Sequence, residues 1–170
     1  MSDPVPPVFL VDAYADPVLV RIAGRAAFAN SASLRDFFRE MIRQGRVRFV
    51  VDFQLCTSMD STFLGVLAGA ALELHRQSPP GTLTLARVGE RNLEIITNLG
   101  LHRLAVVDPG SATPTEGGGS PLPLTQTARS ELESARLMIE AHENLVNADA
   151  SNQTKFQDVL AFLRNRVESR

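Results

Sequence analysis

The chain has 170 residues, of which 44% are hydrophobic and 21% charged, a composition typical of one globular domain with or without an appendage. Seventeen Lys and Arg face nineteen Asp and Glu, and a net charge of -2 lacks the basic excess that a nucleic-acid-binding surface needs. A single cysteine, Cys56, excludes an intramolecular disulfide and a multi-cysteine zinc site, and it fits a reducing compartment.

The sequence of the first residues predicts that the chain has no export signal. Residues 1–7 have neither the basic beginning nor the apolar run of a signal peptide, and we expect them to form a disordered N-terminal tail. The longest apolar stretch, Phe63–Leu74, is shorter than the about 20 residues that a membrane-spanning helix requires. The sequence therefore predicts a cytoplasmic protein without a membrane span.

Residues 8–108 alternate between short apolar runs and amphipathic helical patterns. In chain order they predict strands at Val8–Tyr14 and Val18–Ile22, a helix begun by Asn30 or Ser31 and ended by Gly45, a strand at Val47–Phe53, a helix at Ser61–Gln77, a strand at Thr82–Val88, a helix at Glu90–Leu99 and a strand at Leu104–Asp108. This order, ββαβαβαβ, predicts an α/β fold with a mixed, mostly parallel sheet covered by helices.

The remainder of the chain divides into two parts. Residues 109–126 read PGSATPTEGGGSPLPLTQ, and this stretch is too rich in Pro, Gly, Ser and Thr to bury a core, which predicts a flexible linker. Residues 127–168 carry two apolar stripes, one within Ala128–Asn147 and one from Phe156 to Val167, which predict an αα-hairpin. Because an isolated helical pair is marginal in water, we expect the hairpin to pack on the front domain or on a second copy.

The segment between the strand Val47–Phe53 and the next helix is the candidate functional site. It reads CTSMDSTFLGVL from Cys56 to Leu67 and lies at the carboxyl edge of the predicted parallel strands, where ligands and partners usually bind. Ser61 begins the helix. It serves either as a helix cap or as a phosphoacceptor, since a phosphate there meets free N–H groups and the positive end of the helix dipole.

Within residues 8–108 the chain resembles the STAS-domain family of anti-sigma-factor antagonists. The resemblance rests on Val50–Leu74, on Leu83–Asp108 and above all on the Asp-Ser-Thr-Phe-Leu-Gly core from Asp60 to Gly65. It implies a bacterial signalling module rather than an enzyme, with no cofactor and no metal. The phosphorylated residue that it implies is Ser61, with Thr62 as a second candidate. The implied partner-binding residues are Asp52, Ser58, Asp60, Thr62 and Phe63.

The function implied by this resemblance is partner switching in the control of transcription, without direct contact to nucleic acid. The unphosphorylated module would bind a GHKL-type serine kinase that doubles as an anti-sigma factor. Phosphorylation would release it, because a dianion in a contact surface adds repulsion and desolvation cost. A metal-dependent serine phosphatase would reset the module.

The alternative is a phosphorylation-independent STAS scaffold, or a subunit of a larger regulatory or lipid-transport assembly. In this case the chain would form a homo-oligomer through residues 127–168. Phe63 stands where many phosphorylated family members have Gly, and its ring would shield the Ser61 hydroxyl or add a contact to a partner surface.

Several further residues narrow the choice of function. Gly65 and Gly69 each cost about 1 kcal/mol of helix propensity, which indicates a close approach of either the sheet or a partner helix. The single lysine, Lys155, lies in the predicted hairpin, which excludes a response-regulator receiver. No Arg follows Cys56 as in a phosphatase loop, and no Gly-x-Ser-x-Gly surrounds Ser61. Cys56 itself is expected to be a small core residue.

Overall fold

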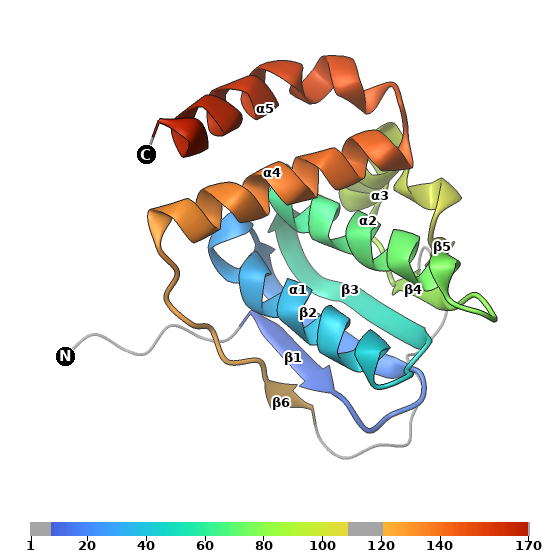
Figure 1. Cartoon of the computed structure of the whole chain (residues 1–170). Helices are drawn as coiled ribbons and strands as arrows, with labels where there is room; N and C mark the ends of the chain where they lie inside the picture. Colours follow the sequence, from blue (N-terminus) through green and yellow to red (C-terminus); the bar gives the residue numbers. More distant parts are fainter. Residues whose placement is uncertain (1–7, 109–120, 170) are drawn as a thin grey trace.

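A computed structural model describes residues 8–108 and 121–169 (Figure 1). The strands are β1 (Phe9–Asp12), β2 (Val18–Ala26), β3 (Arg48–Met59), β4 (Thr82–Ala86), β5 (Val106–Asp108) and β6 (Leu122–Pro123). The helices are α1 (Phe28–Arg43), α2 (Ser61–Arg76), α3 (Glu90–Asn98), α4 (Glu131–Ala148) and α5 (Asn152–Glu168), with a short 3-10 turn at Leu101–Arg103. No helix within these described ranges is long and apolar enough to cross a membrane.

The strands form one mixed sheet in the order β5-β4-β3-β2-β1-β6. Neighbouring strands from β2 to β5 run parallel, whereas β1 pairs antiparallel with β2 and with β6. The predicted α/β class and the order ββαβαβαβ over residues 8–108 are therefore confirmed.

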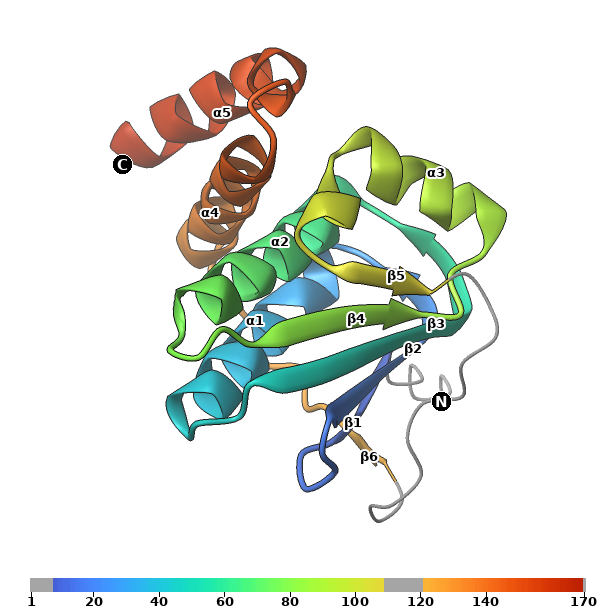
Figure 2. The ribbon, with the colours of Figure 1, turned by 90° about the vertical axis from the view of Figure 1, so that its right-hand side faces the viewer.

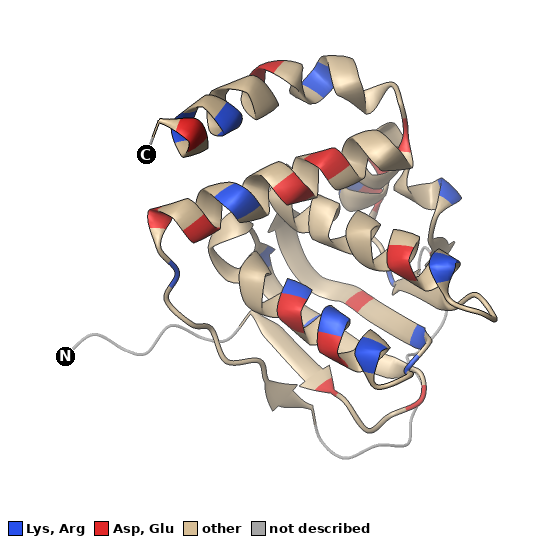
Figure 3. Cartoon of the chain, in the orientation of Figure 1, with Lys and Arg blue, Asp and Glu red and all other residues tan. Residues whose placement is uncertain are grey.

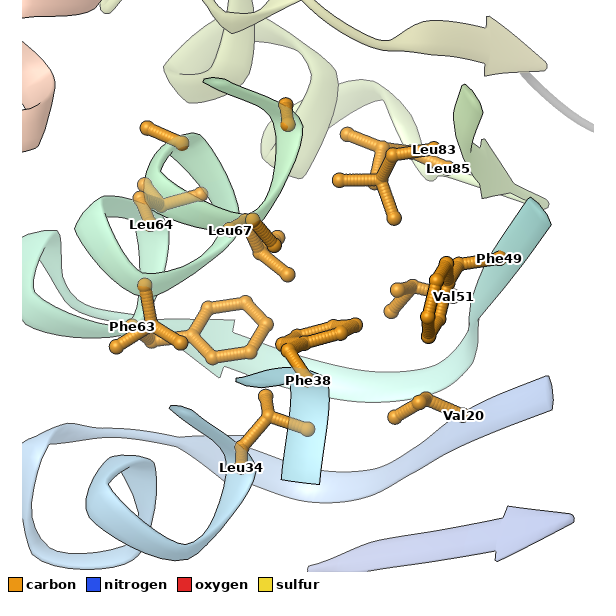
Figure 4. Packing of buried hydrophobic residues seen from close by; sticks show 14 of the residues in the cluster. Val20, Leu34, Phe38, Phe49, Val51, Phe63, Leu64, Leu67, Leu83 and Leu85 are labelled. Atoms are coloured by element: carbon orange, nitrogen blue, oxygen red, sulfur yellow. The ribbon is translucent and has the colours of Figure 1, made fainter. Parts of the chain in front are cut away.

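The core lies between this sheet and the paired helices α1 and α2, which lie side by side on one of its faces (Figure 2). Large apolar side chains fill this layer, and Figure 4 shows residues of α2 projecting toward α1 and the sheet. The five phenylalanines that are almost fully buried are Phe9, Phe38, Phe49, Phe53 and Phe63. Burying side chains of this size supplies much of the free energy of folding.

Helix α1 and strands β2 and β3 extend beyond the bounds that the sequence predicted. Helix α1 begins at Phe28, before the predicted cap at Asn30, because Asn30 lies inside the first turn and its Oδ1 accepts the Ala27 N–H at 3.0 Å. Strand β3 continues to Met59 instead of ending at Phe53, because β2 is also longer than predicted and pairs with it as far as Ala26.

The predicted linker ends in ordered structure. Residues 1–7 and 109–120 lie outside the described residues, but Leu122–Pro123 forms β6 and pairs with β1. The backbone N–H of Leu124 donates to Phe9 O at 2.9 Å, which extends the contact. Proline is tolerated here because an edge strand leaves one side of its backbone unpaired.

The predicted helical hairpin is present as α4 and α5. Helix α4 crosses α2, and α5 packs on α4 as the outermost element (Figures 1 and 2). Of the two packing partners that the sequence left open, the structure shows the front domain. The buried apolar residues of α4 are Ala135, Leu137, Ala141 and Leu145.

Candidate functional site at the start of helix α2

Asp60, rather than Ser61, caps helix α2. Its Oδ1 accepts the Phe63 N–H at 2.9 Å, and its backbone oxygen accepts the Leu64 N–H at 3.2 Å. Its Oδ2 accepts the Phe28 N–H at 2.8 Å, so this carboxylate also fixes the first residue of α1. The capping role that the sequence left open for Ser61 therefore belongs to its neighbour, and the Ser61 hydroxyl is not used for capping.

Ser61 instead contacts the C-terminal helices. Its Oγ lies 2.8 Å from Nε2 of His142 on α4, and the side chain is half-buried beneath that helix. The two residues are 81 positions apart in the sequence. The sequence analysis did not single out His142. The residue lies on the apolar stripe of the helix, four residues after Met138, and this position could have indicated that its side chain faces a neighbouring element.

The hydrogen bonds of His142 define the direction of this contact. Its Nδ1 lies 2.6 Å from the backbone oxygen of Met138, which can only accept, so Nδ1 carries the hydrogen. In the neutral imidazole Nε2 then has a free lone pair, and Ser61 Oγ–H donates to it. The ring is 4% exposed and packs edge-on against Phe156 of α5, with ring centroids 4.9 Å apart.

Gly65 and Gly69 allow α4 to approach this closely. A Cβ atom at Gly65 would lie 2.2 Å from the backbone oxygen of Ala141, and one at Gly69 would lie 2.4 Å from the side chain of Asn144. Asn144 Nδ2 also donates to Gly65 O at 3.2 Å. Of the two alternatives for these glycines, the structure supports a groove for a helix, and the helix is the chain's own α4.

Polar contacts hold the C-terminal helices at two further places. On α1, Arg35 Nη1 lies 2.9 Å from Glu140 Oε2, and Arg39 pairs with the same carboxylate. At the end of α3, the buried Asn152 donates to Leu99 O at 2.9 Å. The single lysine has a role here too, because its Nζ donates to the free carbonyl of Asn98 at 2.7 Å.

Two of the predicted partner-binding residues point inward. Phe63 is fully buried, with its ring 6.0 Å from that of Phe9 and 6.3 Å from that of Phe53, and Thr62 is only 5% exposed. The reason is helical periodicity, since Phe63, Leu67 and Leu74 share the stripe of α2 that faces the sheet. In this structure neither side chain is available to a partner, contrary to what the sequence suggested.

Asp52 is also a buried structural residue rather than a contact residue. Its fully buried carboxylate accepts from Arg87 Nε at 3.0 Å and lies 3.4 Å from Arg21 Nε. Burial by itself would raise the pKa of Asp52, but the hydrogen bond from Arg87, a backbone N–H and the guanidinium charges outweigh it and hold the pKa below its usual value. Arg87, the residue directly after β4, closes this ion pair.

The exposed part of the site is the end of β3. Ser58 is exposed, Asp60 is partly exposed, and Leu55 and Phe28 expose 56% and 48% of their surface nearby on β3 and α1. Cys56 is partly buried, and desolvation raises the pKa of its thiol to about 11, so it is a poor nucleophile at neutral pH.

A cavity of about 600 Å³ lies beside this site, between α1, α2 and α4. Leu137 and Phe38 contribute to its floor, and its rim carries Arg35, Arg39 and Glu140. Ser61 does not line it. Among the described residues no cluster of His, Cys, Asp or Glu could hold a metal ion.

Comparison with known proteins identifies one family. The family model described as "Mlab, STAS domain" matches residues 9–108. No curated protein matches the chain. The solved structure of the anti-sigma factor antagonist SpoIIAA in its unphosphorylated form is 20% identical, covers 52% of this chain and 81% of that one, and gives a TM-score of 0.47. The phosphorylated form of the Bacillus cell fate determinant SpoIIAA is 20% identical, covers 58% and 89%, and gives a TM-score of 0.49. At this identity and overlap, neither likeness carries an argument about function.

Proposed function

The chain belongs to the STAS-domain family, and on that premise we propose that it is a cytoplasmic, non-catalytic interaction module of a partner-switching pathway, controlled by phosphorylation of Ser61. Its partners would be a GHKL-type serine kinase that doubles as an anti-sigma factor and a metal-dependent serine phosphatase. The family is one of regulatory protein-interaction domains, which agrees with this role.

The position of the Ser61 hydroxyl carries the proposal. It stands on the first residue of α2, and Asp60 satisfies the helix cap in its place. A phosphate there would lie at the positive end of the helix dipole. Thr62 is a weaker acceptor because it is almost fully buried.

The partner surface that we propose is the exposed end of β3 with the start of α1. It contains Ser58, the exposed edge of Asp60, and the apolar side chains of Leu55 and Phe28. Exposed apolar side chains around a polar centre are typical of protein-interaction surfaces. A phosphate on Ser61 would place about two negative charges at its border.

Incubation with ATP and the GHKL-type serine kinases of the same genome tests the assignment. We expect mass spectrometry to find the phosphate on Ser61 and to find none in Ser61→Ala. The matched control Ser78→Ala, at an exposed serine beyond the end of α2, should be phosphorylated as the parent chain is. A phosphate on another residue, or unchanged phosphorylation of Ser61→Ala, would refute it.

The alternative proposal is a scaffold or a subunit of a larger regulatory or lipid-transport assembly that needs no phosphate. One observation favours it: the exposed apolar face of α5, where Phe162 is 64% and Val159 is 42% exposed. This face would join two copies of the chain. Light scattering should then give a dimer for the parent chain and a monomer for Phe162→Ser, and a monomer in both cases refutes oligomerisation through α5.

A further inference from the structure

Helix α4 covers the residue on which the proposed function depends. It lies outside the part of the chain that the family model matches, yet its His142 takes the hydrogen bond of Ser61. We propose that docking of α4 on α2 and phosphorylation of Ser61 oppose each other, so that the C-terminal helices are a cover that a phosphate on Ser61 releases. This inference rests on Ser61 as the phosphoacceptor.

The hydrogen bond itself is incompatible with a phosphate. The phosphoryl group replaces the hydrogen that Ser61 Oγ shares with His142 Nε2, so the lone pair of Nε2 faces an anion without a hydrogen between them. The ring has little freedom to turn away, because Met138 O holds its Nδ1 and Phe156 packs against the ring. The bulk of the phosphate would therefore displace α4 as a whole, and not only the side chain of His142.

A negative charge beside Ser61 acts in the same direction. Helix α4 carries four glutamates and one arginine (Figure 3), but its Glu140 and Glu143 are paired with Arg35 and Arg164. Asp60 already places a carboxylate next to Ser61. A dianion added at Ser61 would lie next to this carboxylate in a half-buried position, where water screens the repulsion between them less than at the surface.

The contacts that hold α4 on the rest of the chain determine the free energy that its release must overcome. They include the buried side chains of Leu137 and Leu145, the fit of Ala141 against Gly65, the ion pair of Glu140 with Arg35, and the hydrogen bonds of Asn144 and Asn152. When α4 leaves, the groove at Gly65 becomes a surface for another helix with a small residue where Ala141 stands. The two equilibria are linked. If phosphorylation of Ser61 raises the equilibrium constant for release of α4 by some factor, release of α4 raises the equilibrium constant for phosphorylation by the same factor.

Hydrogen–deuterium exchange on the full chain tests this coupling. Phosphoserine is installed at residue 61 during synthesis, so the measurement does not depend on any kinase. A chain with phosphoserine at Ser78, which is exposed beyond the end of α2, is the matched control. We expect the amides of α4 to exchange about tenfold faster with the phosphate at 61, with β3 unchanged and no effect of the phosphate at 78.

The outcomes separate this inference from the proposed function. Unchanged exchange of the α4 amides overturns the proposed cover, and slower exchange also overturns it, because the phosphate would then stabilise the docking of α4. In His142→Ala, the accelerating effect of the phosphate should shrink severalfold, since the opposing ring is gone. An effect of full size in that variant would overturn the role of the Ser61–His142 contact. If the kinase assay finds no phosphate on Ser61, the proposed function is refuted. The exchange measurements do not depend on a kinase, so they still test the coupling between a phosphate at residue 61 and the docking of α4.

Discussion

Substitution Gly65→Ala should detach α4 without weakening α2. A Cβ at this position would lie 2.2 Å from Ala141 O and 2.6 Å from Ala141 Cβ, whereas ordinary contacts lie at 3.4–4 Å. All of the atoms in conflict belong to α4, so the helix must withdraw by about 1 Å or more. Within α2, alanine is the better helix former by about 1 kcal/mol.

The expected magnitude follows from what α4 buries. Leu137 and Leu145 are 3% and 0% exposed, and full burial of a leucine contributes about 1.5–3 kcal/mol. The hydrogen bond from Asn144 to Gly65 O adds about 1 kcal/mol. Overpacking of a tight contact costs about 1–3 kcal/mol, which is a large part of this docking free energy. A loss of ~3 kcal/mol corresponds to about a hundredfold increase in the opening of α4.

Hydrogen exchange of the full chain measures this opening directly. We expect the amides of α4 and α5 in Gly65→Ala to exchange about a hundredfold faster, and those of β3 to be unchanged or slower. Gly89→Ala is the matched control, because a Cβ at Gly89 meets no atom within 4 Å. If the exchange of α4 in Gly65→Ala equals that in Gly89→Ala, the reasoning about the close approach is refuted.

Three further predictions concern buried polar groups. Asp52→Asn should lower the free energy of unfolding by ~3 kcal/mol in urea denaturation, because it breaks the buried pair with Arg87. Since the folded-state pKa of Asp52 is lowered, its stabilisation is fully present above about pH 4 and is lost as pH falls through that pKa, and Asp52→Asn should lack this loss. Cys56, with a pKa of about 11, should react with iodoacetamide at pH 8 at least about tenfold more slowly than free cysteine, and an equal rate would contradict its burial. Asn152→Ala should destabilise the protein by about 1–3 kcal/mol, because Leu99 O and Leu145 O lose their buried donor, and an unchanged melting temperature would contradict this.

Helix α4 shares the apolar core of the region that the family model matches. Residues 9–108 carry the family fold, whereas α4 contributes Leu137 and Leu145 to the same apolar core. A variant that frees α4 therefore exposes apolar surface on α2. Light scattering beside each exchange experiment would detect association through that surface.

The order of the elements followed from the sequence because hydrophobic periodicity is local. The spacing of apolar residues in α1, α2 and β3 depends only on near neighbours, and the Asp60-Ser61 motif marked the start of α2. The inward direction of Phe63 was also within reach, since Phe63, Leu67 and Leu74 recur at helical spacing.

Contacts between distant segments were decided only by the tertiary structure. The sequence pattern gave α4 an apolar stripe but no partner, and only packing on Gly65 placed His142 against Ser61. The family resemblance implied that Asp52 contacts a partner, and only the fold brought Arg87 to its buried carboxylate. Apolar burial is non-directional, so local patterning determines which residues are hidden, whereas shape and charge complementarity between remote segments determine what they contact.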